Sequence, residues 1–179
     1  MSRKLLLAAV AACAFAAAGC TTNEAAVEAA SSGNLTPTER AAYVGMAAAS
    51  DMYEIQSSQL ALTRAQTPAL RDFAQMLITD HTNTTRQLTA AATAAGMAPP
   101  APALLPMQVQ MLNQLQGTGG GDFDRVYASQ QVQAHQMALA LHSNYAQNGD
   151  AEPLRAVASA AVPVIQHHLD TAGQLAGGS

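Results

Sequence analysis

Hydrophobic residues recur at three- and four-residue spacings over four long stretches of this chain, a pattern typical of amphipathic α-helices. The clearest stretch begins at Thr67 and ends at Gly96. Thr67 is suited to cap the helix and Pro68 to open it, because the first helical position has no intrahelical partner for an N–H to lose. Gly96 is suited to end the helix, and the prolines that follow prevent its continuation. One face of this helix carries Leu70, Phe73, Leu77, His81, Thr84 and Leu88.

Three further stretches have the same periodicity and predict helices over residues 37–66, 122–147 and 150–176. The first of them follows a capping-box signature, with Thr36 as the expected N-cap and Glu39 three residues later. The turns after the first and third long helices are short, so each joins an antiparallel pair.

The connection between the two pairs is long and rich in proline and glycine, with a short helix expected over residues 107–115. Two tight hairpins joined by one long crossover are the connectivity of a ferritin-like antiparallel four-helix bundle. The sequence therefore predicts an all-α domain over residues 36–176, with the short extra helix carried on the crossover.

The N-terminus has the pattern of an export signal over residues 1–19, with a short basic start followed by an apolar run too short to span a bilayer. The run ends at Ala-Ala-Gly-Cys, which resembles a bacterial lipobox and predicts lipidation of Cys20; the alternative is ordinary cleavage that leaves a free thiol. Thr21 in place of Asp favours the periplasmic face of the outer membrane, the alternative being a soluble periplasmic or secreted protein. Residues 21–35 are small and polar and predict a flexible tether.

The net charge of the chain limits which kinds of molecule it can bind. Two of the eight basic residues lie in the signal, so the remainder carries six basic residues against twelve acidic ones. A chain this acidic has no electrostatic footprint for nucleic acid or anionic lipid, and both are excluded as partners. Attachment to a membrane would come from the acyl chains on Cys20. The sequence identifies no protein partner and no oligomeric state.

A weak internal repeat relates the two hairpins. The pattern His-x-x-Thr-x-x-Gln-Leu begins at His81 and again at His168, in the second helix of each hairpin. In the first helices, Glu54 and His135 occupy matching places, each six residues before a leucine. One polar residue from each helix is therefore expected at the same level of the bundle.

Three segments resemble a bacterial exported ferritin-like family catalogued as a domain of unknown function and often labelled an outer membrane protein. They are LRDFAQMLITDHTNTTRQL, GDFDRVYASQQVQAHQMAL and PLRAVASAAVPVIQHHLDTA. The resemblance covers roughly residues 35–175 and implies a four-helix bundle located in the cell envelope. It implies no activity, but Glu54, His81, His135 and His168 match the recurring polar positions of the family.

These four residues allow two interpretations. They could hold a divalent transition metal such as zinc, iron or copper. They could instead form a buried polar network that fixes helix register. A ferritin-type di-iron site is disfavoured, because Ile78 and Ile165 stand where a Glu-x-x-His pair would place its glutamates.

Other candidates carry less weight. His167 is expected at the rim and His142 near the bundle end, while Asp80 is expected to face solvent or an arginine. Scattered methionines, Met46, Met52, Met76, Met107, Met111 and Met137, fit core packing better than a copper site. No catalytic motif is present in the sequence. The sequence thus predicts a lipid-anchored envelope bundle acting as a binding or stress-associated module, or alternatively a metal-binding, redox-capable protein.

Overall fold

A computed structural model describes residues 21–98 and 101–178. In it, the apolar faces predicted from the sequence pack against one another. Every regular element in this part of the chain is helical: α1 (Thr21–Ser31), α2 (Arg40–Arg64), α3 (Pro68–Ala94), α4 (Pro106–Gly117), α5 (Asp122–Asn148) and α6 (Glu152–Gly177). The predicted signal peptide and Cys20 lie outside the described residues.

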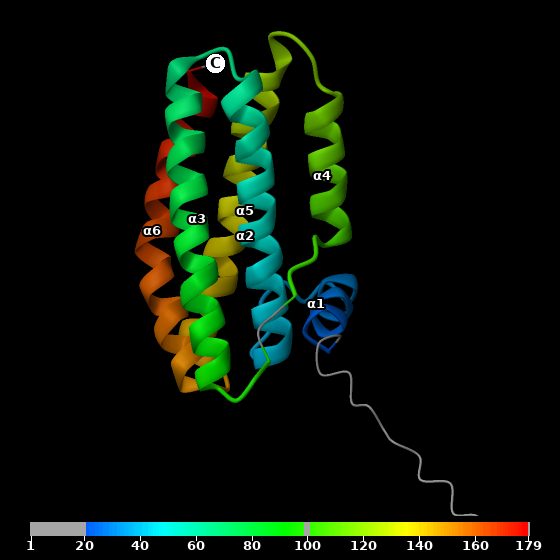
Figure 1. Ribbon diagram of the computed structural model, residues 1–179, viewed down its shortest axis with the longest axis vertical. Coiled ribbons are helices and arrows are strands. Elements are labelled where there is room, and N and C mark those ends of the chain that lie inside the picture. The colour runs from blue at the N-terminus through cyan, green and yellow to red at the C-terminus, as the bar shows by residue number, and fades with distance from the viewer. Residues whose placement is uncertain (1–20, 99–100, 179) are drawn as a thin grey trace, which may run out of the picture.

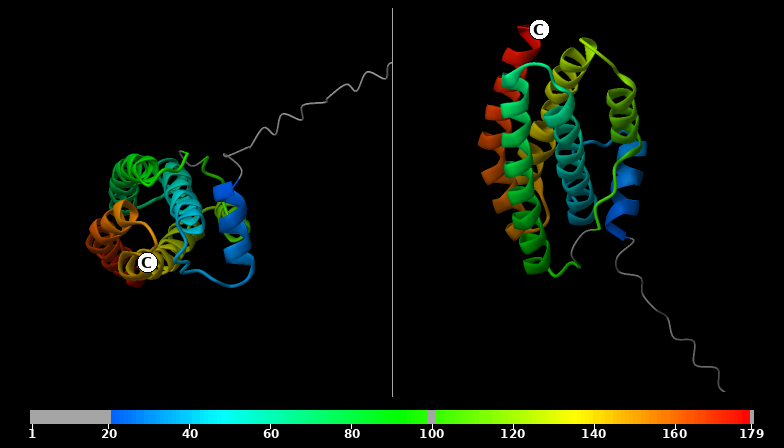
Figure 2. Two further views of the ribbon diagram at one scale, coloured as in Figure 1. Left: turned by 90° about the horizontal axis from the view of Figure 1, so that it is seen from below. Right: turned by 45° about the horizontal axis from the view of Figure 1, so that its top comes forward.

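The four long helices form the expected ferritin-like bundle (Figure 1). Helices α2 and α3 make one hairpin and α5 and α6 the other, and each helix packs on two neighbours around the bundle. The crossover between the hairpins carries α4 along the side formed by α2 and α5 (Figures 1 and 2). The predicted fold class is confirmed, and the long helices match the predicted ranges to within a few residues.

Local signals explain most helix ends. Thr67 has the extended backbone of an N-cap, Pro68 begins α3, and Gly96 has a φ of +76° just beyond its end. The prediction for Thr36 is wrong, since α2 begins at Arg40. The preceding segment is held instead by tertiary bonds, because Asn144 Nδ2 donates to the Thr36 carbonyl at 2.7 Å.

The predicted tether is also wrong over residues 21–31, which form α1 and pack across α2. Ala26 is buried at this contact, and Gly45 of α2 lies against it. A Cβ at Gly45 would lie 2.7 Å from the Cβ of Ala26 and would also clash with the carbonyl oxygen of Thr22. Alanine and glycine allow the two helices to approach closely, so a segment without a broad apolar face still docks.

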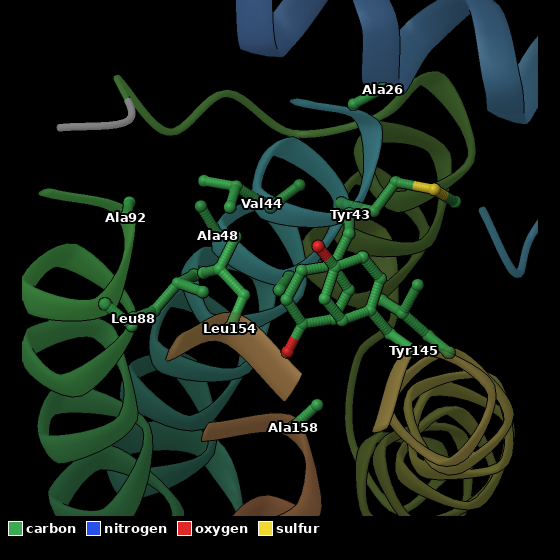
Figure 3. Close-up of a cluster of buried hydrophobic side chains, with 14 of the residues drawn as sticks. Ala26, Tyr43, Val44, Ala48, Leu88, Ala92, Tyr145, Leu154 and Ala158 are labelled. Carbon is green, nitrogen blue, oxygen red and sulfur yellow. The ribbon is translucent and has the colours of Figure 1, made fainter. Parts of the chain in front are cut away.

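Two apolar clusters fill the bundle on either side of its middle. At the α1 end, the rings of Tyr43 and Tyr145 stack at 3.7 Å between centroids, beside Leu154 (Figure 3). At the other end the core contains Leu77, Phe123 and other large side chains. His81 comes between Leu77 and Leu88 on α3, and these leucines belong to different clusters. The predicted polar level therefore lies between two apolar regions.

None of the helices in the described ranges has the length and hydropathy needed to cross a bilayer.

Replacing Gly45 with alanine should release α1, because the new methyl group and the α1 backbone cannot occupy the same space. We expect faster proteolysis within residues 21–35 and a lower melting temperature, on the order of 1–3 kcal/mol of destabilisation. Gly173→Ala is the matched control, because a Cβ there meets nothing within 4 Å and alanine favours a helix. Equal protease resistance in Gly45→Ala and the unchanged protein would contradict this account of α1.

Candidate metal centre

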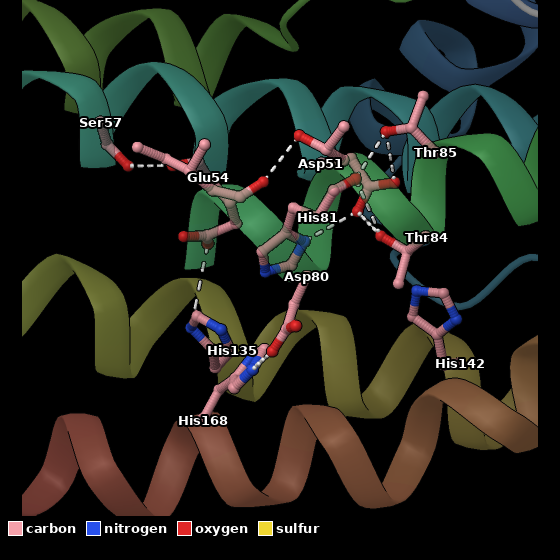
Figure 4. Close-up of polar contacts among 12 residues, drawn as sticks. Asp51, Glu54, Ser57, Asp80, His81, Thr84, Thr85, His135, His142 and His168 are labelled. Atoms are coloured by element: carbon pink, nitrogen blue, oxygen red, sulfur yellow. Dashed lines mark hydrogen bonds and ion pairs between the residues drawn. The ribbon is translucent and has the colours of Figure 1, made fainter. Parts of the chain in front are cut away.

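Three histidines from three helices meet in the middle of the bundle. His81 comes from α3, His135 from α5 and His168 from α6, and their exposed fractions are 5%, 1% and 1%. The ring centroids lie 5.8 Å apart for His81 and His135, 5.6 Å for His81 and His168, and 5.3 Å for His135 and His168. Figure 4 shows the three rings turned toward a common space. The sequence prediction that these residues converge is confirmed.

Each ring is held by a hydrogen bond at one of its two nitrogens. His81 Nδ1 lies 2.8 Å from Asp51 Oδ1, and His168 Nε2 lies 2.9 Å from Asp80 Oδ2. His135 Nδ1 lies 2.9 Å from the backbone carbonyl oxygen of Gln131 on the preceding turn. Carboxylate and carbonyl oxygens can only accept, so the bonded nitrogen of each ring carries the proton.

The other nitrogen of each ring, Nε2 of His81 and His135 and Nδ1 of His168, is buried and has no hydrogen-bond partner among the described residues. The three histidines each offer one ring nitrogen, and these nitrogens lie within 4.8 Å of one another. In neutral imidazole the unprotonated nitrogen is an acceptor. When the rings are neutral, their inner nitrogens are acceptors that face a common space, an arrangement that a bound cation would satisfy.

Glu54 of α2 lies beside this group. Its Oε1 is 3.9 Å from His135 Nδ1, on the side of the ring already bonded to Gln131, and its Oε2 has no partner within the described chain. Glu54 does not belong to the set whose ligand atoms lie within 4.8 Å of one another. That Glu54 is a metal ligand stays a prediction, while its position next to the histidines is confirmed.

Burial and the two aspartates set the protonation of the rings. Burial lowers the pKa of His135 to about 3, helped by the charge of His81, and burial also lowers the pKa of His168 despite the bond to Asp80. For His81, burial is outweighed by the hydrogen bond and charge of Asp51, so its pKa is raised. Burial raises the pKa of Glu54 to about 7, although the charge of His81 opposes it. Two of the three rings are thus held neutral, the form that binds metal.

Asp51 is the functional residue that sequence reasoning missed. It lies three positions before Glu54 on α2 and is buried, and its carboxylate also accepts from the hydroxyls of Thr84 and Thr85. The i, i+3 spacing from Glu54 placed it on the same helix face and could have identified it.

The Asp80 side chain is 36% exposed, as expected for a residue that faces solvent, but it also reaches across from α3 to bond His168 on α6, which the sequence did not predict. A hollow in the bundle is lined by side chains from α2, α3, α5 and α6, among them Asp51, Asp80, His81, His142 and His168.

The remaining histidines lie outside the group. His167 is exposed, as predicted for a rim residue. His142 lies farther along α5, where its Nδ1 is 3.1 Å from the hydroxyl of Tyr43 (Figure 4 shows its ring). Burial lowers the pKa of His142 to about 4.

Fold and site together define an all-helical bundle with a buried histidine cluster, and the family follows from sequence comparison. The chain belongs to the family described as a domain of unknown function, DUF4142, whose profile matches residues 24–175. The predicted family resemblance is confirmed. No curated protein is significantly similar to the chain in sequence.

Solved structures with similar folds include two kinds of protein. CopM in its Cu(II)-bound form is 19% identical with a TM-score of 0.66, over 78% of this chain and 97% of CopM. CopM in its apo form is 19% identical with a TM-score of 0.62, over 76% and 94%. A DUF305 fragment from Deinococcus radiodurans is 18% identical with a TM-score of 0.65, over 76% and 94%. At these identities the likeness establishes the fold.

The lowered pKa values predict acid lability of the metal-free protein. An unfolded histidine binds a proton below about pH 6.5, whereas His135 and His142 in the folded state do so only near pH 3 and 4. The unfolded state therefore binds more protons in this window, and the free energy of unfolding should fall as the pH is lowered from about 6.5 toward 4. Each histidine contributes up to about 1.4 kcal/mol per pH unit. Glu54 has the opposite effect on the pH dependence of the free energy of unfolding, since its raised pKa keeps the folded carboxyl protonated up to about pH 7.

Denaturant titrations at several pH values, with a chelator present, measure this slope. His142→Gln should make it shallower, because the variant no longer carries the ring whose pKa is lowered on folding. His167→Gln is the control and should leave the slope unchanged, because that ring is exposed. A slope that is the same in all three proteins would contradict the assignment.

Proposed function

We propose that this protein binds a transition-metal ion through His81, His135 and His168, and that copper is its metal. The observation that carries the proposal is the set of three buried ring nitrogens without partners, one from each ring, in a space where the rings meet. A buried acceptor without a donor costs on the order of 1–3 kcal/mol. A cation bound by all three would remove that cost.

The hydrogen bonds at the outer nitrogens support the same proposal. Metal-binding histidines commonly donate their second N–H to a carboxylate or backbone carbonyl, which fixes the tautomer and increases the basicity of the ring. Asp51, Asp80 and the carbonyl of Gln131 provide these acceptors here. The two carboxylates also place negative charge beside the cation.

A purely structural network is less well supported by these contacts. In such a network the inner nitrogens would bond one another, Glu54 or water, and among the described residues they bond neither one another nor Glu54. Tetrahedral ligands about 2.0–2.1 Å from an ion are about 3.3 Å apart. With the three nitrogens already within 4.8 Å, small side-chain rotations would close them on an ion.

The kinds of donor atom at the site limit which metal ions it can bind. Three imidazoles without a thiolate suit Cu²⁺, Zn²⁺, Ni²⁺ and Fe²⁺, and Cu²⁺ binds most tightly in this series. One structure of similar fold, that of CopM, has been solved with Cu(II) bound, which adds support for copper. The fourth position is open, and we propose Glu54 or a water molecule for it.

We propose in addition that the chain is exported and held at the periplasmic face of the outer membrane by acyl groups on Cys20. The signal pattern of residues 1–19 and the lipobox-like Ala-Ala-Gly-Cys support this. In that arrangement α1 follows the anchor directly, so the bundle would sit close to the membrane. Its role there would be to bind metal in the envelope.

Cu²⁺ should raise the melting temperature of protein made without a His tag. At a hundredfold excess over the dissociation constant the stabilisation is about 2.7 kcal/mol, or about 5–10 °C for a domain of this size. His135→Ala should abolish this shift and the one equivalent of copper measured by elemental analysis, because the ring is one of three ligands. His167→Ala, on the same helix as His168 but exposed, should keep both.

Two further variants refine the test. Asp51→Ala should weaken copper binding by about 10–100-fold, because it releases the His81 ring. Glu54→Gln should weaken it only if Glu54 is the fourth ligand. The proposed site would be overturned if every histidine variant kept its bound copper.

Lipidation is tested separately in cells grown with labelled palmitate. Cys20→Ala should remove the label and move the protein from the membrane fraction to the soluble fraction, because the acyl chains are the only proposed anchor. Cys13→Ala is the matched control, since that cysteine lies inside the signal, and it should keep the label. Labelled Cys20→Ala protein would contradict the anchor.

A further inference from the structure

A second group of metal-binding side chains lies on the opposite side of α5, around a pocket between α2, α4 and α5. Four methionines line this pocket: Met46 from α2, Met107 and Met111 from α4, and Met137 from α5. Seven methionines follow Met1 in the sequence, so more than half of them line this one pocket. Met46 and Met111 belong to buried core clusters, as the expectation of core packing predicts, and the pocket adds that four of the methionines line one space.

The crossover helix explains how the group forms. Met107 and Met111 are four residues apart on α4, so they lie on one face of that helix. The face is turned toward α2 and α5, on which α4 packs. Short-range sequence motifs miss this arrangement, because the other two methionines come from helices far along the chain.

The thioether sulfur atoms of the methionines are the main potential metal ligands in this pocket. Met46 and Met111 are 5% and 7% exposed, while Met107 and Met137 are half-buried and reachable from solvent. Two of the three polar side chains that line the pocket are already engaged. Tyr53 donates its hydroxyl proton to Gln130 at 2.9 Å, and the side-chain oxygen of Gln108 accepts the backbone N–H of Leu105 at 2.9 Å.

We infer that this methionine pocket binds a soft monovalent cation, Cu(I) or its analogue Ag(I). Thioethers are neutral, polarisable ligands that select Cu(I) over hard divalent ions. A largely apolar pocket also favours an ion of low charge, because each added charge increases the cost of removing water. The acidic chain, with a net charge of −4, attracts cations in general.

The inference does not depend on the histidine centre, because the two sites use different donors. They are nevertheless neighbours: Ser50 and Ala138 line both the methionine pocket and the histidine-lined hollow. Helix α5 supplies His135 to one site and Met137 to the other, two positions apart and so on different sides of the helix. The protein would then hold copper in two ligand environments, imidazole and thioether.

Ag(I), which is not redox-active under these conditions, is the probe. Silver nitrate is added in chloride-free buffer to the mature chain labelled with ¹³C at the methionine methyl groups. We expect the methyl resonances of Met46, Met107, Met111 and Met137 to shift together and saturate at one equivalent. Those of Met52 and Met76, which do not line the pocket, should stay in place.

Binding of Ag(I) is then measured in double variants. Met107→Leu with Met111→Leu keeps the side-chain volume, and should bind Ag(I) at least about tenfold more weakly because two soft ligands are lost. Met52→Leu with Met76→Leu is the matched control and should bind unchanged. His135→Ala should also keep this Ag(I) site, which separates failure here from failure of the histidine centre. Unshifted pocket resonances in the unmodified chain, or full binding by the first double variant, would overturn the inference.

Discussion

The hydrogen bonds at the outer nitrogens of three buried histidines are the constraint on which the site depends. Asp51, the Gln131 carbonyl and Asp80 each hold one ring and fix its proton on the outer side. The inner nitrogens are thereby left buried and without a hydrogen-bond partner among the described residues. A buried ring nitrogen that finds no donor costs on the order of 1–3 kcal/mol.

The apolar clusters on both sides of the site offset this cost. The stacked tyrosines and leucines at the α1 end, and the phenylalanine and leucine side chains at the other end, keep the four helices in register. With the helices fixed in this way, the rings cannot separate to reach solvent. The packing around the bundle is asymmetric, and it leaves two different pockets. One pocket is lined by His81 and His168, and the other, beside α4, is lined by the four methionines.

The site also explains how a ferritin-like bundle can depart from the di-iron pattern. Ile78 and Ile165 stand one turn before His81 and His168, where the di-iron proteins carry glutamates. The carboxylates are instead Asp51 and Asp80, which bond the rings from outside. Moving the anions from the ligand positions to the outer hydrogen bonds changes a hard, oxygen-rich site into a nitrogen-rich one. Nitrogen donors suit copper and zinc better than a pair of iron ions.

The sequence by itself determined the four long helices, their hairpin pairing and the convergence of Glu54, His81, His135 and His168. These follow from periodicity, caps and the internal repeat, which are properties of local sequence. It could not determine that residues 21–31 dock as a helix, because that depends on the close approach of Ala26 to Gly45 on another element. Nor could it assign Asp51 and Asp80 to their histidine partners, or gather four methionines around one pocket. Those contacts join residues distant in sequence, and only the relative rotation and height of the packed helices decide which side chains meet.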